Sequence, residues 1–297
     1  MARIAIGGAS GLVGTRLCNA LSVEGHSLVR LVRRAAAGPD EAEWDPAHGR
    51  LDPAALEGID AFVHLSGESI AAGRWSPARK SKILESRTVT TRLVSAALAR
   101  LASKPALVAA SAIGYYGDRG GEWLDETSRP GRGFLPEVCV EWERACDAAR
   151  VAGLRVVNVR IGVALDPSGG ALAAMLVPFR LGLGGRLGTG AQYVSWITLD
   201  DLVGALRHCL VSTTLSGPVN AVAPAPVTNS ELTRALSRAL GRPAVLRVPA
   251  SALRLVLGKA ADELLLGGAR ISSGKLERSG FVFRDSDIEA ALRRILV

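Results

Sequence analysis

The sequence has few of the residues that mark disulfide-rich or metal-binding proteins. It holds only four cysteines, Cys18, Cys139, Cys146 and Cys209, and no two of them stand in a CxxC spacing. The four histidines are equally dispersed. We therefore expect neither a disulfide framework nor a metal site, and a reducing cytoplasm fits this cysteine usage best.

Long apolar runs are missing as well. No stretch of about 18 uninterrupted apolar residues occurs, so we expect no transmembrane helix and no membrane partner. The N-terminus passes directly into a strand-like segment at 3–6 without a basic region and apolar core, so no secretory signal is expected. The remaining composition, 48% hydrophobic and 22% charged over 297 residues, is that of a globular protein with room for one large domain and a smaller lobe.

Acidic residues are outnumbered by basic ones, and the formal net charge is +8. From Ser230 onward twelve Lys and Arg face seven Asp and Glu, but they stand singly among helical leucines and alanines. No basic block or interleaved aromatic platform accompanies them. A solvated helical surface is favoured over an anionic small-molecule pocket, and a nucleic-acid partner is set aside.

Short apolar runs alternate with longer helical patterns over the first half of the chain, which is typical of a doubly wound parallel sheet. Strands rich in Val, Ile, Leu and Ala are predicted over 3–6, 27–33, 61–65, 106–111 and 155–160. Helices are predicted over 13–24, 78–101 and 135–152, and Gly25 and Gly153 follow two of them as caps. The predicted fold class is α/β, with a Rossmann-type doubly wound parallel sheet and a smaller C-terminal lobe.

The alternation weakens in the second half. The glycine-rich stretch 178–190 is predicted to be a loop, 219–222 an edge strand, and the segment from Thr228 to Gly241 a capped helix. We assign 1–165 to the Rossmann domain, and we expect later segments, about 196–225, to return to its sheet. The smaller lobe takes 166–297, and its part 228–297 is helical.

The most informative motif is a GxxGxxG pattern between the first strand and the first helix. Its glycines permit a tight turn, close approach of a pyrophosphate to the backbone and packing of helix on strand. Amides at the helix N-terminus then point at the phosphates. We expect cofactor contacts from Gly8, Ser10, Gly11, Leu12, Val13 and Gly14.

The end of the second predicted strand indicates which dinucleotide is bound. An acidic residue about 20 positions beyond the glycines would hold the ribose 2′-hydroxyl of NAD. This chain has Arg33 and Arg34 there, and a guanidinium binds a 2′-phosphate with charge-assisted hydrogen bonds. The predicted cofactor is NADP(H), with Arg33 the stronger candidate, since Arg34 is as well explained as a surface arginine.

Landmarks of one family run along almost the whole chain. They are GGASGLVG at 7–14, HLSGE at 64–68, ESR at 85–87 with TT at 90–91, SAIGYYG at 111–117, WE at 142–143, RIGV at 160–163, PFRLGLGG at 178–185, WI at 196–197 before DD at 200–201, and NAVAP at 220–224. With them the chain resembles the atypical, epimerase-like branch of the extended short-chain dehydrogenase/reductases. It is most similar to the sugar-nucleotide-epimerase-like proteins that carry a C-terminal domain of unknown function.

Strand ends and the resemblance together add further candidates. Cofactor contacts are expected from Leu65, Ser66, Gly67, Glu68, Arg87, Ser111 and Arg160, although Arg160 is equally suited to a structural ion pair. Substrate contacts are expected from Lys82, Trp142, Phe179 and Trp196. For the aromatic residues core packing is as good an interpretation, and for Lys82 a solvated surface is the better one.

In one respect the chain departs from the family it resembles. Competent members use a Tyr-x-x-x-Lys pair on a helix and a Ser or Thr at the preceding strand end, and the lysine lowers the pKa of the tyrosine. The equivalent helix here, 135–152, has no tyrosine or lysine, and the two places fall near Cys139 and Glu143. The hydroxyl is displaced too, because Ala112 takes the matching place and Ser111 precedes it. Tyr115 or Tyr116, helped by Glu143 or Cys139, is the alternative proton donor.

Two functions remain open from the sequence. The first is an NADP(H)-dependent oxidoreductase or epimerase acting on a small anionic, sugar-nucleotide-like substrate. The second is an NADP(H)-binding sensor or structural protein without turnover. Slow or no turnover of ordinary sugar nucleotides is expected, and a homodimer is left as an open alternative.

Overall fold

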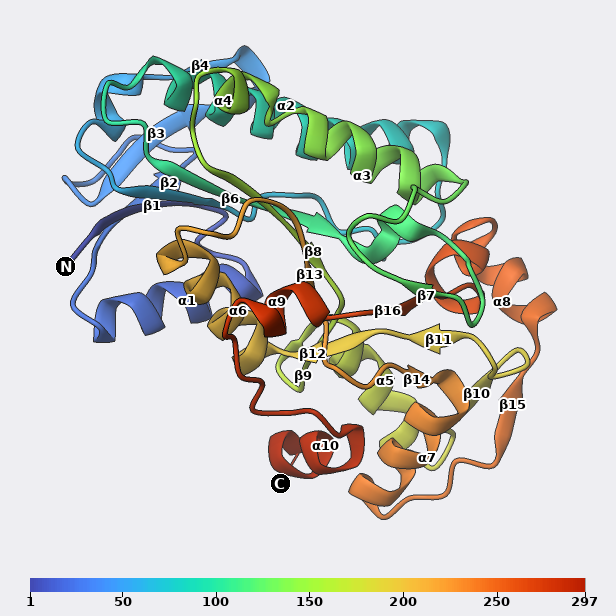
Figure 1. Cartoon of the computed structure of the whole chain (residues 1–297). Helices are drawn as coiled ribbons and strands as arrows, with labels where there is room; N and C mark the ends of the chain where they lie inside the picture. The colour runs from blue at the N-terminus through green and yellow to red at the C-terminus, as the bar shows by residue number, and fades with distance from the viewer. Residues whose placement is uncertain (297) are drawn as a thin grey trace.

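The structure, a computed structural model, describes residues 1–296. Its centre is an eight-stranded sheet in the order β13-β8-β6-β5-β1-β2-β3-β4 (Figure 1). Neighbouring strands are parallel except for β3 and β4, which pair antiparallel at one edge. The strands are β1 (Arg3–Gly7), β2 (Ser27–Val32), β3 (Glu41–Asp45), β4 (Arg50–Leu51), β5 (Ala61–His64), β6 (Ala106–Ala112), β8 (Val156–Ile161) and β13 (Gly217–Ala221).

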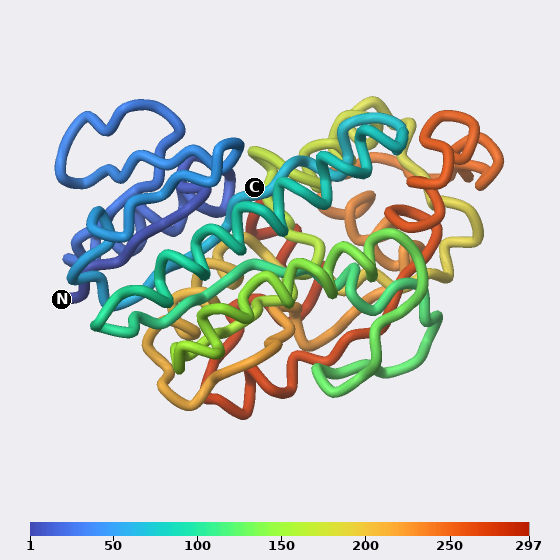
Figure 2. Tube along the Cα trace, turned by 90° about the horizontal axis from the view of Figure 1, so that it is seen from above, coloured from blue at the N-terminus to red at the C-terminus, as the bar shows by residue number. Residues whose placement is uncertain are grey.

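Helices cover both faces of this sheet (Figure 1). On one face lie α2 (Pro77–Arg100), α3 (Phe134–Arg144) and α4 (Asp147–Val151), and Figure 2 shows α2 and α3 running side by side. On the other lie α1 (Leu12–Val23) and α6 (Leu199–Val211). Two hydrophobic cores result, with Leu98 of α2 in one and Leu17 of α1 and Leu202 of α6 in the other. The doubly wound fold class predicted from the sequence is confirmed.

A third core lies in the second half of the chain. It is built on α5 (Gly170–Arg180), α7 (Asn229–Leu240) and α10 (Ile288–Leu296), whose apolar side chains pack together around the indole of Trp196. Two further helices, α8 (Ala250–Leu257) and α9 (Gly274–Arg278), lie between α7 and α10 in the sequence. Besides the large sheet there are four two-stranded sheets. They pair β7 (Trp123–Leu124) with β16 (Arg270–Ile271), β9 (Val163–Asp166) with β12 (Trp196–Thr198), β10 (Gly185–Leu187) with β15 (Leu246–Val248), and β11 (Tyr193–Val194) with β14 (Val227–Thr228).

Several predicted elements differ from the observed ones. The single helix expected over 135–152 is two helices, because the chain bends at Ala145 and Cys146 between α3 and α4. The loop expected over 178–190 begins with the last residues of α5, and β10 lies within it. Pro178 is accommodated inside α5, and Gly182, at φ 72°, follows the helix end in the left-handed conformation. The predicted edge strand at 219–222 is confirmed as β13.

Parallel strands place their carboxyl ends along one edge of the sheet, and the loops that follow β1, β2, β5, β6 and β8 all leave from there. Of the nineteen predicted cofactor and catalytic residues, eleven lie in these connections and eight lie in α1, α2, α3, β6 and β8. Within residues 1–296, no helix has the length and hydropathy needed to cross a membrane.

Candidate functional site

The glycine loop between β1 and α1 is shaped by two tight contacts within the protein. Gly8 has φ 84°, and a Cβ there would lie 2.8 Å from the carbonyl carbon of Leu65. A Cβ at Gly14 would lie 2.1 Å from the Gly8 oxygen. At Gly11 the nearest heavy atom to such a Cβ is the Gly8 oxygen at 3.4 Å, so the protein itself leaves room for a side chain. Packing within the protein therefore does not by itself require a glycine at position 11.

The first turn of α1 is open to an anion. Gly11 is the N-cap residue and supplies no side-chain hydrogen bond, and the first turn has no acidic residue. The free amides and the positive end of the helix dipole therefore suit a pyrophosphate. The side chains of Leu12 and Val13 pack against the core beneath, so these two residues can reach a phosphate only through their backbone amides.

A cavity of about 1090 Å³ lies beside this loop, at the carboxyl ends of β1, β2 and β5. It brings together nine of the predicted cofactor residues, namely Gly8, Ser10, Gly11, Arg33, Arg34, Leu65, Ser66, Gly67 and Glu68. Leu12, Val13, Gly14, Arg87, Ser111 and Arg160 do not line it. The cavity is also lined by Arg30, Glu41 and Trp44, which no sequence motif indicates, and by Glu85, Ser86 and Thr90, which belong to the landmarks at 85–87 and 90–91 but were not predicted as contacts.

The two arginines after β2 differ in their contacts. Arg33 is exposed, and no hydrogen bond or ion pair of its side chain is found within residues 1–296. Arg34 forms a two-pronged ion pair with Glu41 of β3, with both N–O distances 2.7 Å. Hydrogen bonds from Arg34 and from the Ala37 amide lower the pKa of Glu41 to about 2. The Glu41 carboxylate therefore stays charged, and Arg33 is the arginine whose side chain has no partner within residues 1–296.

Glu143 and Arg160 form the centre of a buried polar network at the ends of β6 and β8. Arg160 donates to both carboxylate oxygens of Glu143, at 2.8 and 2.9 Å, and its side chain is 2% exposed. Ser111 also donates to Glu143, at 2.8 Å. Burial alone lowers the pKa of Arg160, but Glu143 more than offsets it and raises that pKa above the ordinary value. Arg160 is thus engaged in an ion pair, the alternative that the sequence left open.

Tyr116 completes this network and is fully buried. Its hydroxyl accepts from Arg160 at 2.9 Å and donates to the Asn220 side chain at 2.7 Å. Burial raises the pKa of Tyr116 to about 12. With both hydrogen-bonding directions filled inside the protein, this hydroxyl has no free position for a substrate.

Tyr115 and Cys139 have different surroundings. The Tyr115 ring lies over the Arg160 guanidinium, 3.4 Å from its central carbon, and its residue is only partly buried. No hydrogen-bond partner of the Tyr115 hydroxyl occurs in the described part of the chain. The Cys139 thiol contacts the Ala112 carbonyl at 3.6 Å, and burial, followed by the charge of Glu143, raises its pKa to about 12. Of the five candidate catalytic residues, Tyr115 alone combines a free hydroxyl with partial exposure.

The four predicted substrate residues do not come together. Lys82 is exposed on α2. Trp142 is buried, donates to Thr91 at 3.0 Å and packs against Arg87. Phe179 and Trp196 lie in the third core, where Trp196 donates to the Ala225 carbonyl at 2.9 Å. The core-packing interpretation describes these three aromatic side chains.

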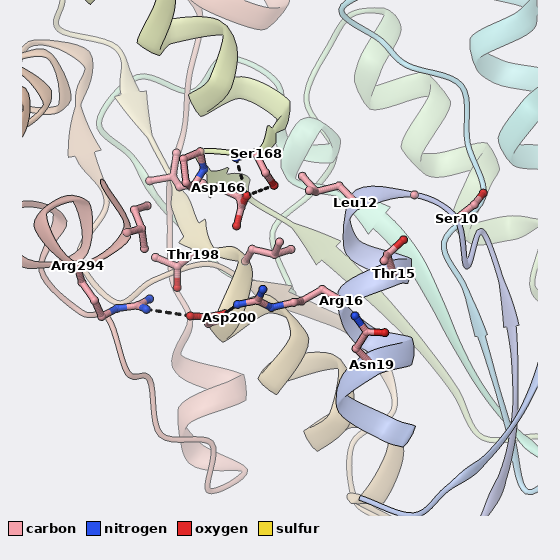
Figure 3. A pocket seen from close by; sticks show the side chains of 15 residues that line it. Ser10, Leu12, Thr15, Arg16, Asn19, Asp166, Ser168, Thr198, Asp200 and Arg294 are labelled. Carbon is pink, nitrogen blue, oxygen red and sulfur yellow. Dashed lines mark hydrogen bonds and ion pairs between the residues drawn. The ribbon is translucent and has the colours of Figure 1, made fainter. Parts of the chain in front are cut away.

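A second, smaller cavity of about 580 Å³ adjoins the glycine loop on the side of α6 and α10 (Figure 3). Arg16 and Arg294 point at Asp200 from opposite walls, at 2.7 and 2.9 Å. The Asp166 carboxylate accepts from the Ser168 amide. Arg16, Asp200 and Arg294 thus pair with one another and tie α1, α6 and α10 together. Within residues 1–296, no cluster of three or more potential metal ligands was found.

A doubly wound sheet whose first loop leaves helix amides open to a pyrophosphate is the fold of the short-chain dehydrogenase/reductases, and the chain is of that class. Its residues 4–220 match the model of the NAD dependent epimerase/dehydratase family, and residues 248–295 match a domain of unknown function, DUF1731. The chain belongs to the NAD dependent epimerase/dehydratase family.

Relatives resemble the chain over its full length. "Epimerase family protein Mb2239" of Mycobacterium bovis is 47% identical over 289 residues, 97% of this chain and 96% of the relative. The crystal structure of the human epimerase family protein SDR39U1 with NADPH has a TM-score of 0.87 and 34% identity, covering 99% of this chain and 98% of that one. The UDP-N-acetylglucosamine 4-epimerase of Bacillus cereus, with a TM-score of 0.75 and 18% identity, shares the fold.

Proposed function

We propose that the chain binds NADPH at the glycine loop and uses it to reduce the carbonyl group of a small anionic substrate. Three observations support the cofactor: the space at Gly11, the uncapped amides of α1 and the free guanidinium of Arg33. The NADPH in the SDR39U1 crystal structure, a relative of 34% identity, supports the same choice. When bound, NADPH supplies a hydride to a carbonyl carbon.

The free hydroxyl of Tyr115 carries the catalytic part of the proposal. Tyr115 follows β6 at the carboxyl edge of the sheet, one strand beyond β5, whose end lines the cofactor cavity. Its hydroxyl donates the proton that the carbonyl oxygen takes up as the hydride reaches the carbon. The Arg160 guanidinium packed on its ring holds the ring in place, and Glu143 holds Arg160. Ser111, Tyr116 and Glu143 are positioning residues in this scheme.

The basic side chains of α2 support an anionic substrate. Arg87 of this helix packs against Gly67 in the wall of the cofactor cavity, and Lys82, five residues before it, is exposed on the same helix. Their positive charges favour a phosphate-bearing, sugar-nucleotide-like molecule over a neutral one.

Absorbance of NADPH during prolonged incubation with a panel of carbonyl compounds tests the enzyme. We expect slow oxidation of NADPH that is lost in Tyr115→Phe. The matched control is Tyr193→Phe, which removes the same hydroxyl group from a tyrosine in the second half of the chain and should retain the activity. Robust activity that survives Tyr115→Phe, Tyr116→Phe and Ser111→Ala would place the chemistry on other residues.

A second candidate function is an NADPH sensor without turnover. The observation that favours it is the Glu143–Arg160 ion pair, which fills the region where competent family members keep the lysine of their catalytic pair. A sensor would bind NADPH tightly and leave it unoxidised with every carbonyl compound of the panel, whereas the enzyme would oxidise it with at least one.

A further inference from the structure

Glu41 of β3 lies in the wall of the cofactor cavity, directly behind Arg34. Its side chain is 9% exposed, whereas that of Arg34 is 60% exposed. The carboxylate is therefore the inner member of the ion pair and the guanidinium the outer one. An incoming anion meets Arg34 first.

The hydrogen bonds of Arg34 leave one edge of its guanidinium free. Both terminal nitrogens donate to Glu41, and Nη1 also donates to the Ala35 carbonyl at 2.9 Å. These bonds use three of the five N–H groups of the side chain. The Nε–H and the remaining Nη2–H, which point the same way along one edge, have no partner in residues 1–296. Such an edge is a fork that matches two oxygens of a phosphate.

Glu41 cannot serve as the acid that holds a ribose hydroxyl in NAD-binding proteins of this fold. Its Oε1 accepts from Arg34, and its Oε2 accepts from Arg34 and from the Ala37 amide at 2.9 Å. The same carboxylate thus fixes both the guanidinium and the loop 35–40 that follows it. Glu41 therefore acts on a ligand indirectly, by holding Arg34 in place.

We propose that Glu41 is a positioning residue for cofactor selectivity, holding Arg34 so that its free edge binds the 2′-phosphate of NADPH beside Arg33. This inference rests on the proposed binding of NADPH. It assigns Arg34 a direct role that its surface ion pair alone would not suggest, and it gives a purpose to Glu41, one of the acidic residues in the cavity wall. Removal of the Glu41 charge should weaken NADPH and leave NADH, which has no 2′-phosphate, unaffected.

Calorimetric titration of both cofactors into Glu41→Gln, Arg34→Ala and the double variant tests the proposal. In Glu41→Gln we expect the Kd for NADPH to rise about tenfold, the size of one weakened charge-assisted contact, and the Kd for NADH to stay within about twofold. In the Arg34→Ala background the same substitution should change neither value, because a residue that acts through Arg34 has nothing left to position. Glu43→Gln is the matched control, since Glu43 is exposed two residues along the same strand.

Three results would overturn the proposal. Tighter NADPH binding in Glu41→Gln would show that the carboxylate repels the phosphate. Equal weakening of both cofactors would show that Glu41 only maintains the pocket. A loss for NADPH that persists in the Arg34→Ala background would show that Glu41 does not act through Arg34. Failure of the unaltered chain to bind NADPH would instead reject the proposed function itself, so the two failures are distinguishable.

Discussion

At the scale of single residues, the glycine loop separates what the fold needs from what a ligand needs. Gly8 and Gly14 touch backbone atoms of the protein, so a Cβ at either position collides with the chain itself. Gly11 has no such contact. The tight turn at Gly8 and the close packing at Gly14 were predictable from the sequence because the turn, the strand before it and the helix after it are all local in the chain, whereas the ligand contact at Gly11 stays a prediction.

Gly11→Val should abolish NADPH binding without unfolding the protein, because its side chain occupies space that the ligand needs. Calorimetry and a thermal melt of the same sample provide the two readouts. Gly14→Ala is the contrasting variant. Its Cβ lies 2.1 Å from the Gly8 oxygen, so this substitution should lower the melting temperature, which Gly11→Val should leave unchanged. A folded Gly11→Val that binds NADPH like the unaltered chain would show that the pyrophosphate lies elsewhere.

His64 at the end of β5 gives stability a pH dependence. It is fully buried, its Nε2 contacts the Thr90 hydroxyl at 3.1 Å, and its Nδ1 has no partner in the described chain. Burial lowers the pKa of His64 to about 4, against an ordinary value of 6.5. The folded protein thus resists the proton that the unfolded chain accepts. The stabilisation is complete above pH 6.5 and is lost as the pH falls toward 4.

Between pH 6.5 and 4, the free energy of unfolding should therefore fall by about 3 kcal/mol more in the unaltered chain than in His64→Leu. Urea denaturation across this range measures the difference. Parallel curves for the two proteins would contradict a buried neutral histidine.

At the scale of elements, α3 depends on a distant carboxylate. Gly133, its N-cap residue, has no side chain to cap the helix, and the amides of Phe134 and Leu135 donate to Glu263 at 3.1 and 2.7 Å. Glu263 lies in a single π-helical turn, Asp262–Leu266. The C-terminal region thereby fixes the helix that carries Glu143.

Loss of this cap should be measurable by itself. Glu263→Ala should lower the free energy of unfolding by about 1–2 kcal/mol, as expected for removal of an N-cap carboxylate. Asp262→Ala, which removes only an exposed ion pair with Arg254, should cost less than about 0.5 kcal/mol. Equal effects of the two substitutions in urea denaturation would show that Glu263 does not stabilise α3.

The elements predicted correctly are those whose pattern is local and strong. The buried strands β1, β5, β6 and β8 are rich in Val, Ile, Leu and Ala, and α7 has a capping box at Thr228 and Glu231. β3 was missed because its sequence, EAEWD, is mostly charged, and only the inward positions of Ala42 and Trp44 mark it as a strand. Without β3 the pairing of Glu41 with Arg34 could not be predicted. The Glu143–Arg160 pair likewise depends on packing of α3 against β8, which no local pattern specifies.

At the scale of the whole molecule, ionic contacts join the C-terminal helix to the Rossmann sheet. Asp201 at the start of α6 accepts from the amides of Arg284 and Asp285, both at 2.9 Å. Arg294 of α10 pairs with Asp285 and Asp200, and Asp200 pairs in turn with Arg16 of α1 (Figure 3). These contacts link α10, through Asp200 of α6, to the helix that begins at the glycine loop.

The most direct test of the proposed function is calorimetric titration of NADPH and NADH into the unaltered chain and into Arg33→Asp. The unaltered chain should bind NADPH at least about tenfold more tightly than NADH, since Arg33 is free to meet the 2′-phosphate. Arg33→Asp should weaken NADPH binding by about 1.5–3 kcal/mol and remove that preference. Equal affinities of the unaltered chain for the two cofactors would contradict an NADPH site at this edge of the sheet.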